Sequence, residues 1–144
     1  MSTKAERSHA QKRELLRASI DRGVSSAAQH PIVQEAQRVY RLARALSPGT
    51  KYVPGSLVAV DWDAIIQLTR SVSSIGANVI EGTAKSDPVD MLRFFRTSRG
   101  SAYEAYYWGE LLNVDFLKDI EQLCDVCDDN ISQLLDSFGE IGEN

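Results

Sequence analysis

Two cysteines, Cys124 and Cys127, have the spacing of a redox pair or of half a zinc site. Both fall on an apolar stripe with helical periodicity, which predicts that the two thiols are buried. Zinc would need two further ligands, and the two histidines of the chain, His9 and His30, both lie near its N-terminus. We therefore interpret both cysteines as core residues, and we expect neither a metal nor a cofactor.

Carboxylates with polar neighbours form a second group of candidate residues. Asn78 and Glu81 are three residues apart, and Glu104 likewise follows a serine by three residues, so each pair shares one face of a helix. Paired carboxylates can perform acid–base catalysis or hold a metal. The sequence shows no trio of nucleophile, base and orienting group. We favour a buried structural network in which Arg70 or Arg99 satisfies the glutamates, and we expect no enzyme activity and no small-molecule substrate.

Two rows of arginines, each with a spacing of three residues, could contact phosphates. The candidate nucleic-acid ligands are Arg38, Arg41, Arg44, Arg93 and Arg96. Arg99 completes the second row, but we assign it to an internal ion pair with Glu81 or Glu104. The alternative is a solvated face, or salt bridges between subunits that involve the acidic residues Asp125, Asp128, Asp129 and Asp136. The neighbouring aromatic cluster Tyr103, Tyr106, Tyr107 and Trp108 is more typical of packing or of a subunit interface than of base stacking.

The charge of the chain changes strongly along its length. Residues 1–44 carry nine Lys/Arg against four Asp/Glu, whereas residues 100–144 carry one lysine against eleven acids. The overall charge of −4 argues against a simple sequence-independent DNA coat. The asymmetry indicates a basic surface for an anionic partner, or head-to-tail charge matching between subunits. Merely solvated faces are the alternative.

A length of 144 residues predicts one globular domain with a core of its own. Two closely spaced cysteines form no disulfide framework, and the chain has neither a long apolar run nor a secretory signal. We therefore expect a cytoplasmic protein that does not enter a membrane.

Apolar periodicity predicts helices that position these residues. We expect an N-terminal helical extension over 5–22, a break over 23–30, and then helices over 31–46, 61–82, 88–112 and 115–138. Asp61 and Asp115 are the expected N-caps, Gly82 the expected helix end, and residues 57–60 an apolar lid. Gly100, Ser101, Ala102, Ala105 and Gly109 form a track of small residues for close helix packing.

The predicted fold is all-α, an antiparallel up-down four-helix bundle with an extra N-terminal helical segment. The expected parts are an extension over 1–30, the bundle over 31–140 and a tail over 141–144. Two of the predicted helices carry apolar or small residues on more than one face, which a lone bundle does not require. A homo-oligomer is therefore expected.

Two motifs resemble those of the family named after proteins encoded in 23S rRNA intervening sequences. Residues 70–82, RSVSSIGANVIEG, are similar to R-x-x-x-S-I-P-x-N-I-A-E-G, with Gly76 in place of proline and Ile80 in place of alanine. Residues 93–104, RFFRTSRGSAYE, are similar to R-F-x-x-x-A-x-G-S-x-x-E. The polar and glycine positions of these motifs, which we assign structural roles, are Asn78, Glu81, Gly82, Arg99, Gly100, Ser101 and Glu104.

This resemblance implies a small bacterial, cytosolic helical bundle that assembles as a homopentamer. It also implies a relation in fold to the accessory variability protein of diversity-generating retroelements, a basic pentameric barrel that binds reverse transcriptase and nucleic acid. Our first hypothesis is an oligomeric, non-enzymatic scaffold that binds RNA or DNA, or a nucleic-acid enzyme such as a reverse transcriptase. The alternative is a protein-interaction bundle whose acidic C-terminal helix binds a basic partner without nucleic acid.

Overall fold

The computed structural model describes residues 3–46 and 58–142, which form five helices and contain no strand. These are α1 (Lys4–Ala27), α2 (Pro31–Arg44), α3 (Val58–Thr83), α4 (Pro88–Leu112) and α5 (Leu117–Gly142). The prediction of an all-helical protein is therefore confirmed for the described residues. None of the described helices is long and apolar enough to cross a membrane.

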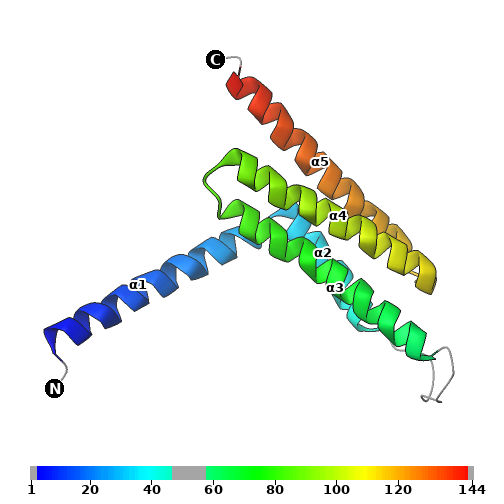
Figure 1. The fold of residues 1–144 in the computed structure, drawn as a ribbon, viewed down its shortest axis with the longest axis horizontal. Coiled ribbons are helices and arrows are strands. Elements are labelled where there is room, and N and C mark those ends of the chain that lie inside the picture. The colour runs from blue at the N-terminus through cyan, green and yellow to red at the C-terminus, as the bar shows by residue number, and fades with distance from the viewer. Residues whose placement is uncertain (1–2, 47–57, 143–144) are drawn as a thin grey trace.

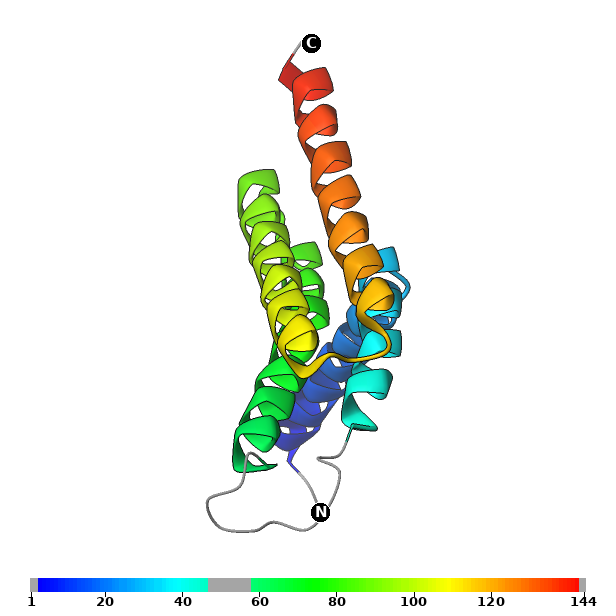
Figure 2. The same cartoon turned by 90° about the vertical axis from the view of Figure 1, so that its right-hand side faces the viewer.

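Helices α2 to α5 pack around one core. α3 contacts both α2 and α4, and α5 contacts both α4 and α2, so α2 and α4 lie diagonally across the core (Figure 1). The short connection between α3 and α4 lets these two helices lie side by side along most of their lengths. α1 projects away from this group, and the C-terminal half of α5 extends beyond the end of α4 (Figure 2).

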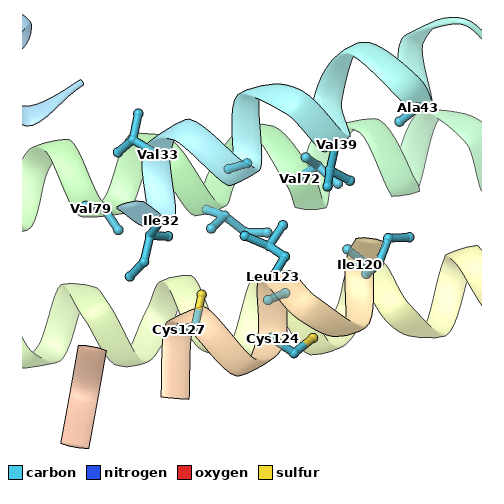
Figure 3. Packing of buried hydrophobic residues seen from close by; sticks show 14 of the residues in the cluster. Ile32, Val33, Val39, Ala43, Val72, Val79, Ile120, Leu123, Cys124 and Cys127 are labelled. Carbon is cyan, nitrogen blue, oxygen red and sulfur yellow. The ribbon is translucent and has the colours of Figure 1, made fainter. Parts of the chain in front are cut away.

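The core is formed by the apolar stripes of four helices. Figure 3 shows α2 and α3 contributing branched aliphatic side chains opposite an α5 stripe that contains both cysteines. The fully buried side chains include Ile32, Val39, Leu68, Ile75, Val79, Ile120, Leu123 and Cys127. The prediction that the cysteines are core residues is confirmed, since both are buried.

The N-terminal helix is longer than the sequence predicted. It begins after Thr3, whose hydroxyl accepts a hydrogen bond from the Glu6 N–H (3.2 Å) while the Glu6 carboxylate accepts one from the Thr3 N–H (2.7 Å). The predicted break at Gly23 is wrong, because the helix continues to Ala27. A helical glycine costs only about 1 kcal/mol relative to alanine. That cost is small enough for burial of Ala27 beside the core to offset it.

α3 begins earlier than predicted, at Val58. Asp61 is therefore not the N-cap but lies in the first turn, where its carboxylate interacts favourably with the helix dipole. The predicted lid is wrong for residues 58–60, which are helical, and its first residue, Leu57, lies outside the described residues. The helix ends at Thr83, so Gly82 lies within its last turn.

The ends of α4 agree with the sequence prediction, whereas the start of α5 does not. The Asp87 carboxylate accepts a hydrogen bond from the Val89 N–H (3.0 Å), and Asn113 adopts a left-handed conformation with φ of 52° at the C-terminal end. α5 begins at Leu117, and the carbonyl of Phe116 accepts its first main-chain hydrogen bonds. Asp115 is therefore not the N-cap, because it lies one residue too early.

Two glycines lie where helices pack closely against each other. A Cβ added to Gly109 would lie 2.7 Å from Cδ1 of Ile120, and one added to Gly82 would lie 2.9 Å from Cβ of Phe94. Gly100 is different, because a Cβ there would meet nothing within 4 Å. The predicted track of small residues is thus correct for Ala102, Ala105 and Gly109, which are buried, and wrong for Gly100.

Candidate interaction surfaces

Arg38, a predicted phosphate ligand, connects α2 to α5. Its guanidinium donates hydrogen bonds to the carboxylates of Glu35 on the same helix and of Asp119 on α5, the latter at 2.8 Å. These hydrogen bonds, the one to Glu35 first, raise the pKa of Arg38 above its already high ordinary value. Two carboxylates therefore neutralise Arg38, which leaves it poorly suited to bind phosphate.

The other two arginines of the α2 row remain accessible. Arg41 and Arg44 are exposed, and neither forms an ion pair with another described residue. Arg41 stands at the rim of a groove of about 340 Å³ between α2 and α3. The remaining lining of this groove includes small and apolar side chains such as Ala36, Val72 and Gly76.

The arginine row on α4 also contains both paired and unpaired arginines. Arg93 forms an ion pair with Asp90 one turn earlier (3.3 Å), and Arg96 is exposed without an ion pair among the described residues. Arg99 pairs with Asp128 of α5 at 3.5 Å. The predicted pairing of Arg99 with Glu81 or Glu104 is wrong for this chain, because Arg99 pairs with Asp128 and neither glutamate forms an ion pair with a described residue.

The two arginine rows do not form one basic surface within a single chain. They lie on α2 and α4, which are diagonal in the packing, with α3 on one side and α5 on the other (Figure 2). The accessible arginines of α2, Arg41 and Arg44, and Arg96 of α4 are therefore carried by helices that lie diagonally across the core.

The carboxylates of the predicted structural network are exposed in this chain. Glu81 forms no hydrogen bond or ion pair with a described side chain, and Glu104 accepts only a long hydrogen bond from the Trp108 indole N–H (3.4 Å). Arg70 is exposed as well. The expectation of a buried carboxylate network is therefore wrong for the single chain.

Neutral polar groups connect α3 and α4 instead. The buried hydroxyl of Ser98 donates to the Ile75 carbonyl (2.9 Å), and the hydroxyls of Ser74 and Ser101 lie 3.1 Å apart. The side-chain amide of Asn78 donates to the Ser74 carbonyl (2.8 Å) and hydroxyl (3.0 Å). Asn78 and Ser101 thus take part in side-chain hydrogen bonds at the contact of α3 with α4, and the structural role assigned to them stays a prediction.

A groove of about 260 Å³ lies between α4 and α5. Its lining residues are Tyr103, Tyr106, Glu121, Cys124, Asp125 and Asp128. The Tyr103 hydroxyl donates to both carboxylate oxygens of Asp128 at 2.9 Å, and this bond raises the pKa of the phenol. The groove therefore combines aromatic surface with a concentration of negative charge.

The cysteines do not supply chemistry to this groove. Burial raises the pKa of Cys124 to about 11 and that of Cys127 to about 12, so both are neutral thiols at physiological pH. In the part of the chain that the structure describes, no three His, Cys, Asp or Glu side chains are grouped so that they could hold a metal ion.

Residues 33–135 match the family described as 23S rRNA-intervening sequence protein. The chain belongs to this family. The match spans both motifs identified in the sequence, and it extends from α2 into α5. No curated protein and no solved structure matches the chain.

The family segment of this 23S rRNA-intervening sequence protein excludes α1, which ends at Ala27. Within the segment, sequence reasoning missed Asp119, the α5 partner of Arg38. It named Asp128 only as a contact between subunits, whereas in this chain Asp128 binds Arg99 and Tyr103. The one available signal was the high acid content of α5, which indicates many carboxylates without indicating their partners.

Proposed function

We propose that this 23S rRNA-intervening sequence protein is a non-enzymatic, homo-oligomeric scaffold. The supporting observation is the α4 outer face, which we define as Val89, Gly100, Tyr107 and Leu111. Val89, Tyr107 and Leu111 are 69%, 57% and 61% exposed. Val89 and Tyr107 are separated by five full helical turns, and Leu111 follows one turn later, so the three lie along one strip of the α4 surface, which also contains Arg93 and Arg96 between Val89 and Gly100.

A neighbouring subunit is the natural cover for such a strip. Fully burying one side chain of this size contributes about 1.5–3 kcal/mol. Gly100, in the middle of the strip, leaves open space where a second helix could approach. The resemblance to the family of 23S rRNA-intervening sequence proteins implies that the number of subunits is five.

We also propose that α2 to α5 form an antiparallel up-down four-helix bundle and that residues 1–30 are an extension of it. The contacts of α3 with α2 and α4, and of α5 with α4 and α2, support this arrangement. In such a scaffold the core is complete within each chain, so the outer faces of the helices are free for assembly.

Light scattering tests this proposal. We expect a wild-type mass that is a multiple of 16.0 kDa, with five as the expected multiple. The double variant Tyr107→Glu/Leu111→Glu should have a lower mass, because two charges would have to be buried at the contact. The control Gln122→Glu/Gln133→Glu adds two charges at exposed α5 positions and should keep the wild-type mass. A wild-type mass of 16.0 kDa at micromolar concentration would contradict the proposal.

Nucleic acid is the ligand class that we propose for the scaffold. Arg41, Arg44 and Arg96 support it, because they are exposed arginines without an ion pair in the described part of the chain. An oligomer would repeat them and could compensate for the net negative charge of each chain. Arg38 and Arg93 are not among the arginines that we propose to bind phosphate, since carboxylates bind both. A reverse transcriptase as partner, and a relation to retroelement accessory proteins, stay predictions.

A further inference from the structure

α1 carries an apolar stripe that contacts almost nothing in its own chain. Leu16, Ile20 and Val24 recur every four residues and are 62%, 55% and 46% exposed. Ala27, at the end of the helix, is its only buried residue among those described. A helix in a folded protein draws most of its stability from packing such a stripe. The stripe therefore indicates a partner outside the single chain.

Basic residues border this stripe. Arg13 precedes Leu16 by three residues, and Arg17 precedes Ile20 by three, so both lie on the same side of the helix as the apolar side chains. We define the α1 docking face as Arg13, Leu16, Arg17, Ile20 and Val24. All five are exposed. Over its whole length α1 carries six Lys/Arg against three Asp/Glu.

A surface of opposite charge to the α1 docking face lies on α5, near the C-terminus. α5 carries seven Asp/Glu against one lysine. Glu121, Asp125 and Asp128 follow one another at intervals of four and three residues and line the groove between α4 and α5. We call these three residues the α5 acidic face. Tyr103 of α4 lies beside them and is 49% exposed, which adds apolar surface to the negative charge.

We propose that α1 of one subunit docks its α1 docking face onto the α5 acidic face of a second copy of this chain. Arg13 and Arg17 would pair with the carboxylates, and Leu16 and Ile20 would cover the tyrosine surface of the groove. The inference rests on the proposed homo-oligomer and assigns to it a contact that uses a helix outside the family segment.

A second copy fits this surface better than the chain itself does. α1 contacts α3, whereas the α5 acidic face opens between α4 and α5. The connection from α1 to α2 comprises only residues 28–30, and α1 and α5 diverge from the body of the molecule (Figure 1). The docking face and the acidic face of one chain are therefore separated, and another subunit must supply the partner.

Reciprocal charge reversal tests the contact in the full chain. One variant carries Arg13→Glu and Arg17→Glu, and the other carries Glu121→Lys and Asp125→Lys. Each alone should have a lower mass in light scattering, with the midpoint of dissociation raised at least about tenfold in concentration. The control Arg7→Glu/Arg22→Glu reverses two arginines outside the docking face and should assemble like wild type. Circular dichroism verifies that each variant is folded.

Mixing the two reversed variants tests whether the α1 docking face and the α5 acidic face meet between two different chains. In a mixture, the reversed α1 of one protein meets the reversed α5 of the other, so the mass should rise above that of either variant alone, although a ring of five would keep one contact between like charges. Reversed variants that keep the wild-type mass would overturn the inference and leave the proposed scaffold intact. A reduced mass that mixing does not raise would also overturn it, because the two faces would then not meet between chains. A monomeric wild type would reject the scaffold and the docking together.

Discussion

At the scale of single residues, two ion pairs connect α5 to the helices that pack beside it. Asp119 and Asp128 of α5 bind Arg38 of α2 and Arg99 of α4, respectively. Both pairs are partly exposed, so each contributes at most about 1 kcal/mol to stability. Their main consequence is geometric, because they attach α5 to both of its neighbours in one register and withdraw two arginines from the binding of anions.

His30 makes stability depend on pH. Its Nδ1 accepts a hydrogen bond from the Ile32 N–H (3.1 Å) at the start of α2, and its ring packs edge-on against Phe95. Burial lowers the pKa of His30 below its ordinary value of 6.5. The unfolded chain therefore binds the proton first, and the stabilisation is complete above pH 6.5 and is lost as the pH falls below it.

The variant His30→Asn isolates this effect. Asparagine can still cap α2 but does not titrate. We expect wild type to lose more stability than the variant between about pH 7 and pH 5, because only wild type must take up a proton at this position when it unfolds. Urea unfolding at both pH values measures the difference. Equal losses of stability in the two proteins would show that His30 is not responsible.

At the scale of helices, the closest packing lies where glycine permits it. α3 reaches the first turns of α4 because Gly82 has no side chain to meet Phe94 and Phe95. The exchange Gly82→Ala improves helix propensity by about 1 kcal/mol, but it places a Cβ 2.9 Å from Cβ of Phe94. That atom is attached to the backbone and cannot rotate away, so α3 and α4 would have to separate.

We expect Gly82→Ala to lower the free energy of unfolding by about 1–2 kcal/mol, since overpacking costs about 1–3 kcal/mol. The matched control is Gly139→Ala on α5, where a Cβ would meet nothing within 4 Å. The control should leave stability unchanged or raise it by up to about 1 kcal/mol. Chemical denaturation of both variants measures these changes. A stabilised Gly82→Ala protein would show that the α3–α4 contact is looser than described.

The sequence predicted helices better than it predicted their contacts. α4 was predicted to the residue, because Asp87 and Pro88 leave little choice for a helix start. The start of α3 was missed because Asp61 is favourable both as an N-cap and in a first turn. Ion pairs such as that between Arg99 and Asp128 could not be predicted, since helical periodicity gives the direction of a side chain without identifying the helix that it meets.

At the scale of the whole molecule, the distribution of charge matters more for the binding of anions than the net charge does. Each chain carries −4, and its negative charge is concentrated on α5. Arg41, Arg44 and Arg96 remain exposed on the diagonal helices α2 and α4. If α5 is covered by α1 of a neighbour, as proposed, part of its negative charge is compensated, and the remaining arginines dominate the exposed surface.

The exposed arginines predict RNA binding that depends steeply on salt. Each phosphate that an arginine neutralises releases a counterion, so affinity for a structured RNA should fall strongly between about 50 and 200 mM salt. Arg41→Gln/Arg96→Gln should weaken binding and reduce the slope of log affinity against log salt by about one for each arginine that no longer binds a phosphate. Sequence preference should be slight, since phosphate contacts carry no base information.

The control for this experiment is Arg38→Gln/Arg93→Gln, which removes the same number of charges from arginines that carboxylates already bind. If the exposed arginines bind phosphate, the control should keep most of the wild-type affinity and the same salt slope. Equally weakened binding by both variants would mean that only the total charge matters. No retention of RNA by wild type at about 50 mM salt would remove nucleic acid as the ligand, since counterion release favours binding most at low salt. A basic protein partner would then take its place.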